Sequence, residues 1–202
     1  MARRDHQQNT PNPAQRHFEW KGGEGVLQYW DKEDKENVQV KLPAVFVLLN
    51  ETSTVSGYAK KRKTGIYANE VADTRAQPLV VKYNDNNEVL ASGLWADIKD
   101  RVTAARGGFA VNCYVAFKDD GKMKVGKVRM AGCALGPWFD FKKAHGKEAY
   151  AQAFTVAAGP RDESGDVEFT PPVFAVKELS AETNAAVAPL YDQVQDNFAG
   201  YF

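Results

Sequence analysis

The chain has 202 residues, of which 44% are hydrophobic and 26% are charged. This balance is that of a globular protein with a buried core, and the length suits one large domain or one domain with appendages. The 26 basic and 26 acidic side chains cancel, which argues against a histone-like protein that coats nucleic acid by bulk attraction. A local basic groove remains compatible with this net charge, because attraction to a polyanion depends on how the charges are distributed.

Residues 1–17 are rich in Arg, Gln, Asn and Pro and lack apolar spacing, so we expect a flexible N-terminal arm there and a single folded domain over residues 18–202. The first residues lack the apolar stretch of a signal peptide, and no apolar run approaches the roughly 20 residues that a membrane-spanning helix needs. We therefore expect a cytoplasmic protein without a membrane partner. In that compartment Cys113 and Cys133 are expected to be reduced core residues, with a disulfide as the alternative.

The sequence after the arm predicts short strands separated by turns. The continuous apolar run at residues 45–49 is typical of a strand buried on both faces. Residues 119–121, Asp-Asp-Gly, form the turn of the clearest hairpin. The expected strands cover residues 25–30, 38–50, 52–58, 65–71, 78–83, 88–92, 109–118, 122–132, 151–157 and 167–176.

Helical features occur in three places. The first is a stripe of apolar residues from Leu94 to Ala105, which ends before Gly107 and Gly108, as is typical of a helix C-terminus. A short helix is expected over residues 138–143, and a final one is expected to begin after Ser180 as its cap. Many short strands, with one helix between them and others later, indicate an α+β protein that is mainly β. We expect an oligonucleotide-binding-fold (OB-fold) barrel of five strands, with an inter-strand helix and a C-terminal helix.

A first basic cluster stands between two tyrosines. Its four consecutive cations are Lys60, Lys61, Arg62 and Lys63, and the flanking rings are Tyr58 and Tyr67. The simple interpretation is a solvated hairpin tip. The functional interpretation is a loop that binds single-stranded nucleic acid, in which cations contact phosphates and rings stack on bases.

A second basic cluster lies on the clearest hairpin. Lys122 and Lys124 share one face of the second strand, and Lys127 and Arg129 share the other unless a bulge intervenes. Such alternation is also typical of a half-exposed strand without a ligand. With the neighbouring Tyr114 and an exposed Trp30, the predicted nucleic-acid-binding residues are Trp30, Tyr58, Lys60, Lys61, Arg62, Lys63, Tyr67, Tyr114, Lys122, Lys124, Lys127 and Arg129.

The sequence contains no recognisable set of catalytic residues. The three histidines are too scattered in the sequence for a metal site, and the chain contains no phosphate-binding glycine loop, dinucleotide fingerprint or serine nucleophile motif. We therefore expect no enzymatic activity, no catalytic residue, no metal and no cofactor. The acidic and aromatic segment 196–202 is either the end of a docked helix or a peptide that partner proteins recognise.

Several short segments together resemble a group of small proteins of tailed bacteriophages. They are GIYANEV (65–71), PLVV (78–81), GLWADIK (93–99), NCYVA (112–116) and SAET (180–183), and the likeness runs from about residue 18 to the C-terminus. The group is generally taken to bind single-stranded DNA and to have OB-fold character. The resemblance carries no set of binding residues, so the residues named above rest on charge and aromatic placement alone.

The resemblance implies that the protein binds single-stranded DNA with little sequence preference in the cytoplasm of an infected bacterium. Its role would lie in phage DNA replication, recombination or transcription. Its partners would be replication, recombination or RNA polymerase proteins, contacted through Asp196 to Phe202. The alternative is a non-catalytic phage structural or assembly protein, which would have the same neutral charge and strand content.

Overall fold

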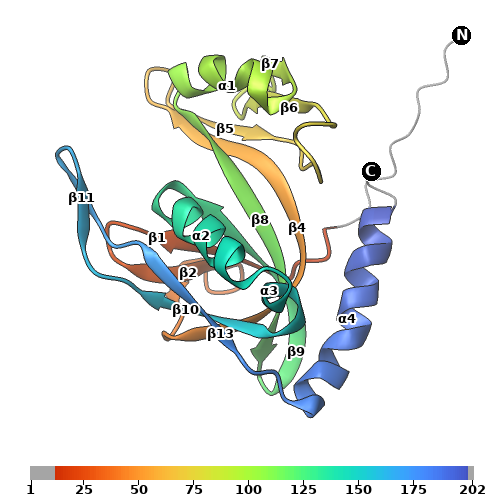
Figure 1. Ribbon diagram of the computed structural model, residues 1–202. Coiled ribbons are helices and arrows are strands. Elements are labelled where there is room, and N and C mark those ends of the chain that lie inside the picture. Colours follow the sequence, from red (N-terminus) through yellow and green to blue (C-terminus); the bar gives the residue numbers. More distant parts are fainter. Residues whose placement is uncertain (1–11, 200–202) are drawn as a thin grey trace, which may run out of the picture.

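Eleven strands form one large, bent sheet in the computed structural model, which describes residues 12–199 (Figure 1). The main path of the sheet is β3 (Glu36–Gln39), β2 (Val26–Asp31), β1 (Arg16–Lys21), β9 (Lys122–Ala131), β8 (Gly107–Asp119), β4 (Ala44–Ala59), β5 (Thr64–Ala68), β6 (Leu79–Tyr83) and β7 (Val89–Gly93). β10 (Ala153–Ala158) pairs with the first part of β4, and β13 (Pro172–Lys177) pairs with β10. β1 and β9 pair in parallel, whereas β8 and β9 pair antiparallel as the predicted hairpin.

The predicted five-stranded barrel is wrong. The protein is α+β and dominated by strands, as expected. Its sheet does not close into a barrel, and the path of strands ends at β3 on one side and at β7 on the other. The physical reason is the length of the central pair. β4 and β8 pair from Val47 to Gly57. β1–β3 join this pair through β9 near its middle, whereas β5–β7 join it at its Gly57 end, so the outer edges β3 and β7 belong to different levels of the pair and do not bond to each other.

The strands expected over residues 38–50 and 52–58 are divided at another place: residues 38–39 belong to β3, and one strand, β4, covers residues 44–59. β4 continues through Asn50 and Glu51, with a bulge between Leu48 and Asn50. Asn50 and Glu51 do not end the strand, because the Glu51 carboxylate is held by hydrogen bonds from three side chains that lie later in the sequence. Its carboxylate accepts hydrogen bonds at 2.8 Å each from Trp138 Nε1 and Lys142 Nζ, and a further one from the Tyr150 hydroxyl. A buried polar group is tolerated in a core when its partners are present.

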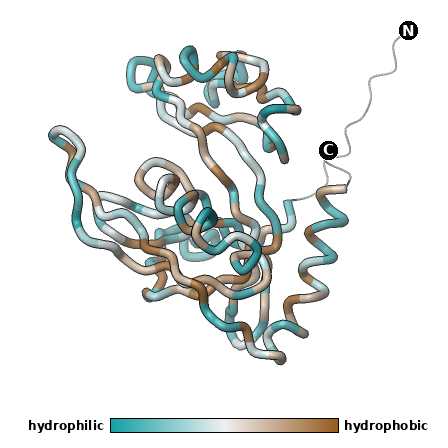
Figure 2. Tube along the Cα trace, in the orientation of Figure 1, coloured by the Kyte–Doolittle hydropathy of each residue, from teal (hydrophilic) through white to brown (hydrophobic). Residues whose placement is uncertain are grey.

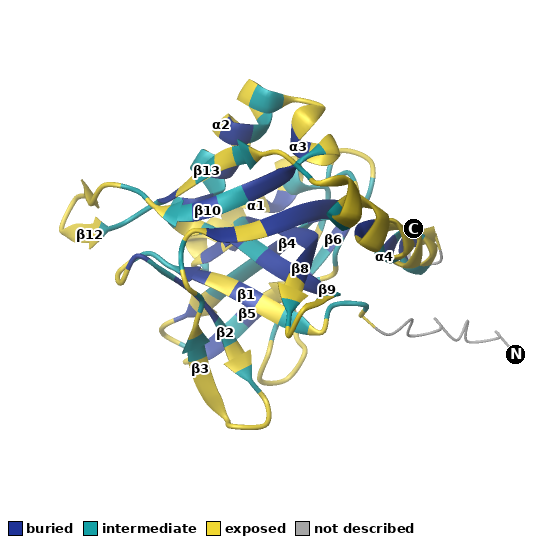
Figure 3. Ribbon diagram, turned by 90° about the horizontal axis from the view of Figure 1, so that it is seen from below, coloured by how far each residue is buried: buried dark blue, intermediate teal, exposed yellow. Residues whose placement is uncertain are grey.

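The helices cover both faces of the sheet (Figures 1 and 3). They are α1 (Trp95–Ala104), the 3₁₀ turn η1 (Gly132–Ala134), α2 (Leu135–His145), α3 (Glu148–Ala151) and α4 (Ala181–Ala199). α1 packs Ile98 and Val102 against the core of β5–β7, and α2 packs the fully buried Trp138 against the core of β1, β9 and β8. α4 lies on the opposite face, where Val187, Val194 and Phe198 pack against β4, β8 and β9.

The predicted final helix and its cap are confirmed, since the Thr183 backbone N–H donates to Ser180 Oγ at 3.2 Å. Hydrophobic and hydrophilic segments alternate along α4, as expected for a helix packed on one side (Figure 2). The expected strand over residues 167–176 is instead divided. β11 (Asp162–Ser164) and β12 (Val167–Phe169) form a projecting hairpin. Thr170 and Pro171 separate it from β13, and the Thr170 backbone N–H donates to Gly22 O at 2.7 Å instead of to a strand of the hairpin.

Order begins before residue 18. The Gln15 backbone N–H donates to Val125 O at 2.8 Å, β1 begins at Arg16, and Arg16 Nη1 lies 2.7 Å from Asp119 Oδ1. Residues 1–11 of the expected arm lie outside the described residues. Within residues 12–199, the helices are too short or too polar to span a bilayer.

Candidate nucleic-acid interface

One face of the sheet carries polar side chains that meet through the strand register. Side chains two residues apart on a strand share a face, and the register aligns them across neighbouring strands. One aligned row consists of Gln39, Gln28, Glu19, Arg129, Asn112 and Thr52. The next row contains Trp30 beside Asn37, and His17 beside Lys127 and Tyr114. The alternate residues, such as Phe18, Leu27 and Val128, lie in the core beneath α2. We call the side with the two rows the polar face.

Glu70, just after β5, covers part of the polar face. Its carboxylate accepts hydrogen bonds from Lys127 Nζ at 3.0 Å, Tyr114 Oη at 2.9 Å and Thr52 Oγ1 at 2.5 Å. Burial opposes ionisation of Glu70, but the charge of Lys127 and the three hydrogen bonds outweigh it and lower the pKa of this carboxyl. Tyr114 and Lys127 are only 3% and 7% exposed. The structure therefore places these two predicted binding residues in a buried network rather than on the surface.

A pocket of about 200 Å³, which we call the tryptophan pocket, opens on the polar face. Trp30, from β2, is 54% exposed at this pocket. The other side chains of the polar face that line it are His17, Glu19, Gln28, Asn37, Lys127 and Arg129. It combines an exposed ring with cations, which is the pair of features that a single-strand binder needs.

A second pocket, of about 550 Å³, adjoins the first, and we call it the tyrosine pocket. Tyr58 and Tyr67, from β4 and β5, are 54% and 37% exposed there. Tyr67 donates its hydroxyl hydrogen to Asn87 Oδ1 at 2.5 Å, which fixes the orientation of the ring. Glu19 and Arg129 line both pockets. The bend of the sheet thus brings β4 and β5 round to the same surface as β1 and β9.

Arg129 stands where the two pockets join. Its pairing neighbour Glu19 places a carboxylate oxygen 2.8 Å from Lys21 Nζ instead. Within residues 12–199, Arg129 forms no ion pair, and its buried Nε lacks a hydrogen-bond partner, as does Oδ1 of the neighbouring Asn112. A guanidinium without a carboxylate partner, in a pocket beside aromatic rings, is suited to a phosphate.

His17 reports the charge of the tryptophan pocket. Partial desolvation of the ring, together with the charges of Lys127, Arg129 and Lys32, lowers the pKa of His17 to about 4. The imidazole is therefore neutral at pH 7, because a proton would be added to a partly buried ring that lies near three cations. Burial is the largest cause of the shift, and the three cations add to it more than Glu70 offsets.

The His17 pKa predicts a pH dependence of stability. Below pH about 6.5 the unfolded chain binds a proton at this residue, whereas the folded chain does so only near pH 4, so the free energy of unfolding is expected to fall between these values. His17→Gln should flatten the decrease over this window and leave the lower-pH loss from carboxylates such as Glu70. Urea unfolding of both proteins at pH 7, 6, 5 and 4 measures the difference. Parallel curves would show that His17 does not titrate in this way.

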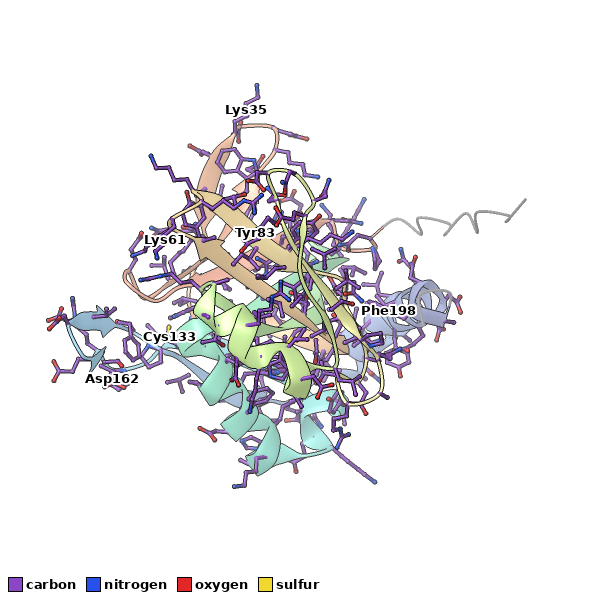
Figure 4. The ribbon with its side chains drawn as sticks, turned by 90° about the horizontal axis from the view of Figure 1, so that it is seen from above. Lys35, Lys61, Tyr83, Cys133, Asp162 and Phe198 are labelled. Atoms are coloured by element: carbon purple, nitrogen blue, oxygen red, sulfur yellow. The ribbon has the colours of Figure 1, made fainter. Side chains whose placement is uncertain are left out.

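The basic turn, residues 60–63 between β4 and β5, divides its cations by role. Arg62 lies over the Tyr83 ring at 4.1 Å from its centroid, 2.9 Å from Asp85 and 2.8 Å from Glu88. It therefore fixes the turn to the β6–β7 hairpin. Lys60, Lys61 and Lys63 are exposed and form no ion pair within residues 12–199, and Figure 4 shows Lys61 pointing away from the sheet.

Replacing Lys60, Lys61 and Lys63 with alanine is expected to reduce the slope of log affinity against log salt for a single-stranded oligonucleotide by up to about 2. Each released counterion contributes about 0.7 to this slope. Stability should not change, since exposed charges add little to it. Fluorescence anisotropy from 50 to 300 mM salt measures the slope. The matched control replaces Lys99, Lys143 and Lys147, which are exposed on or beside the helices of the other face. A triple variant with the slope of this control would show that the turn does not contact phosphates.

Lys122 and Lys124 lie outside both pockets. The register between β8 and β9 runs without a bulge from Asp119–Lys122 to Ala110–Ala131, so the predicted opposition of these lysines to Lys127 and Arg129 is confirmed. Lys124 Nζ lies 2.6 Å from Asp119 Oδ2, and Arg16 contacts the other oxygen of the same carboxylate. Lys122 is exposed at the hairpin tip.

Sequence reasoning missed His17, Glu19, Gln28 and Glu70. The signal for the first three was present, because they alternate with Phe18, Trp20 and Leu27, which are core residues. Their meeting with Arg129 depends on the parallel pairing of β1 and β9, which spans more than a hundred residues. No local pattern reports such a pairing.

The C-terminal segment is docked as far as the structure describes it. Phe198 packs edge-on against Tyr114, with ring centroids 4.8 Å apart, and Asp196 is exposed. Residues 200–202 lie outside the described residues.

In residues 12–199, His, Cys, Asp and Glu side chains form no group that could hold a metal ion. No protein-family model, curated protein or solved structure matches the chain.

Proposed function

We propose that the chain binds single-stranded DNA across the polar face, with little sequence preference. The observation that carries the proposal is the convergence of Trp30, Tyr58, Tyr67 and Arg129. These residues lie far apart in the sequence and line two adjoining pockets. Three of them are exposed rings, and the fourth is a cation without an ion-pair partner among residues 12–199.

The geometry suits an extended strand. From β2, which carries Trp30, to β5, which carries Tyr67, the path across the sheet takes five strand steps. At about 4.8 Å for each step the path is roughly 24 Å along the sheet. With a rise of about 3.4 Å for each stacked nucleotide, roughly seven nucleotides cover this path, within the range of about 4 to 16 for binders of this kind.

The biological part of the proposal rests on the resemblance to the phage group. In an infected bacterium the protein would protect or organise single-stranded DNA during replication, recombination or transcription. Partner proteins would contact the segment from Asp196 onward. Its exposed part in the described helix includes Asp196, since Phe198 is packed on Tyr114.

The test is a comparison of single-stranded and duplex DNA. The full chain is titrated into fluorescent 12-nucleotide strands and into the matching duplex at about 100 mM salt. Single strands should bind more tightly, because stacking on Trp30, Tyr58 and Tyr67 requires unpaired bases. Equal affinity for the two would mean that phosphate attraction alone is measured. Absence of binding would instead favour the structural or assembly protein.

A further inference from the structure

Asn112 lies beside Arg129 on the polar face and is almost fully buried. The two residues pair across β8 and β9, and Asn112 is 2% exposed. Its neighbour on the other side, Thr52 of β4, donates its hydroxyl hydrogen to Glu70. Within residues 12–199, neither Asn112 Oδ1 nor the buried Arg129 Nε has a hydrogen-bond partner. A buried acceptor and a buried donor that stay unpaired lower the stability of a fold.

Other cations on the same strand as Arg129 do have carboxylate partners. Lys127 Nζ lies 3.0 Å from Glu70 Oε1, and Lys124 Nζ lies 2.6 Å from Asp119 Oδ2. An aspartate has nearly the shape of an asparagine and, next to Arg129, would place a negative charge beside the guanidinium. The neutral amide therefore leaves Arg129 with a charge that an acidic side chain of the same size would cancel.

The charge of Arg129 decides the net charge of the tryptophan pocket. Of the acidic and basic side chains that line this pocket, Glu19 and Lys127 have ion-pair partners, and His17 is neutral at pH 7. Arg129 supplies the remaining positive charge. Since its Nε is buried, the donors that it offers to a ligand are the N–H groups of its terminal nitrogens. These groups suit the paired oxygens of a phosphodiester.

We propose that Asn112 is a specificity-determining residue of the interface, which keeps the guanidinium of Arg129 available to a phosphate of the bound strand. It acts through Arg129 and does not itself touch the strand. The unpaired Oδ1 and Nε are the loss of stability that accompanies an open anion site. This inference rests on the proposed function and adds to it one phosphate contact that a carboxylate at residue 112 abolishes.

Asn112→Asp is expected to change binding and stability in different ways. The full chain and the variant are titrated with a fluorescent 12-nucleotide thymidine strand from 50 to 300 mM salt. The variant should lose about 0.7 from the slope of log affinity against log salt, because one phosphate contact fewer releases its counterion. At 0.1 M salt this loss is an affinity about fivefold weaker. The melting temperature should not fall, since the carboxylate gives the buried Nε a charged acceptor.

Three further variants isolate the charge of Arg129. Gln39→Glu is the matched control, because it adds the same negative charge to the same row of the polar face, on β3 and outside both pocket linings, and it should keep the slope of the parent. Asn112→Ala removes the amide without adding a charge, so it should keep the slope and bind within twofold of the parent. Arg129→Gln removes the guanidinium and should lose the same slope as Asn112→Asp.

The possible results distinguish this inference from the proposed function. A slope of Asn112→Asp equal to that of the parent, or a slope that Asn112→Ala lowers as much as Asn112→Asp does, overturns the role of Asn112. If Asn112→Asp melts early, Asn112→Ala and Arg129→Gln decide, and equal slopes in these two overturn the role. In each of these cases the parent still binds the thymidine strand, so the proposed function stands. Failure of the parent to bind this strand overturns the proposed function itself.

Discussion

Glu70→Ala is expected to lower the free energy of unfolding by about 3–5 kcal/mol, because it leaves a buried cation without its partner. The side chains of Lys127 and Glu70 are 8% and 16% exposed, and the carboxylate also accepts from Thr52 and Tyr114. For a chain of this length the loss corresponds to a melting temperature lower by roughly 6–20 °C. Urea unfolding and a thermal melt monitored by circular dichroism measure both quantities.

Two controls make the Glu70 result specific. The double variant Glu70→Leu with Lys127→Met removes both charges and should recover most of the loss, since a buried ion pair can be replaced by apolar residues of similar volume. Arg75→Ala breaks the exposed pair with Asp73 nearby, keeps the backbone hydrogen bond that the Asp73 carboxylate accepts, and should leave the melt unchanged. The pKa of Glu70 is lowered in the folded chain, so its contribution is present at neutral pH and is lost as the pH falls through that lowered value. A Glu70→Ala protein as stable as the parent would contradict the assignment.

Replacing Trp30, Tyr58 and Tyr67 together with alanine is expected to remove measurable binding to single-stranded DNA. Each ring that stacks on a base contributes about 1–3 kcal/mol. The single variants should therefore weaken binding by this amount at every salt concentration, with an unchanged salt slope, because a neutral ring releases no counterions. All three rings are substantially exposed, so the melting temperature should change little. Anisotropy titrations at three salt concentrations measure affinity and slope together.

The matched control for the aromatic variants is Tyr191→Ala. Tyr191 is 48% exposed on α4 and lines neither of the two pockets. Its removal should leave binding within error of the parent. If the triple variant binds as tightly as Tyr191→Ala, the polar face is not the interface.

Local pattern was enough to predict most of the elements but not how they pair. The Asp-Asp-Gly hairpin, the helix after Leu94 and the Ser180 cap all depend on residues close in sequence, and the structure contains them. The barrel was wrong because closure depends on which edges meet. The parallel contact of β1 with β9 and the continuation of β4 through Glu51 depend on distant partners such as Trp138 and Lys142.

The exposure of a candidate binding residue could be predicted only where no segment distant in sequence covers it. Trp30, Tyr58 and Tyr67 are exposed, as a ring beside Gly-rich or charged sequence suggested. Tyr114 and Lys127 are buried instead, because Glu70 binds both from the segment after β5 and Phe198 of α4 packs on Tyr114. The alternation along β9 did separate Lys122 and Lys124 from Arg129, since it depends only on the two-residue period of a strand.

A single guanidinium serves both pockets, and this limits how a bound strand gains affinity with length. An oligonucleotide short enough to occupy one pocket already has the whole of the Arg129 charge available to it. A longer one that reaches the second pocket adds the rings of Tyr58 and Tyr67 but must divide the N–H donors of the two terminal guanidinium nitrogens between two phosphates, since Nε is buried. Lengthening the strand across this junction therefore adds stacking on Tyr58 and Tyr67, and any electrostatic attraction that it adds comes from Lys60, Lys61 and Lys63 in the neighbouring turn rather than from Arg129.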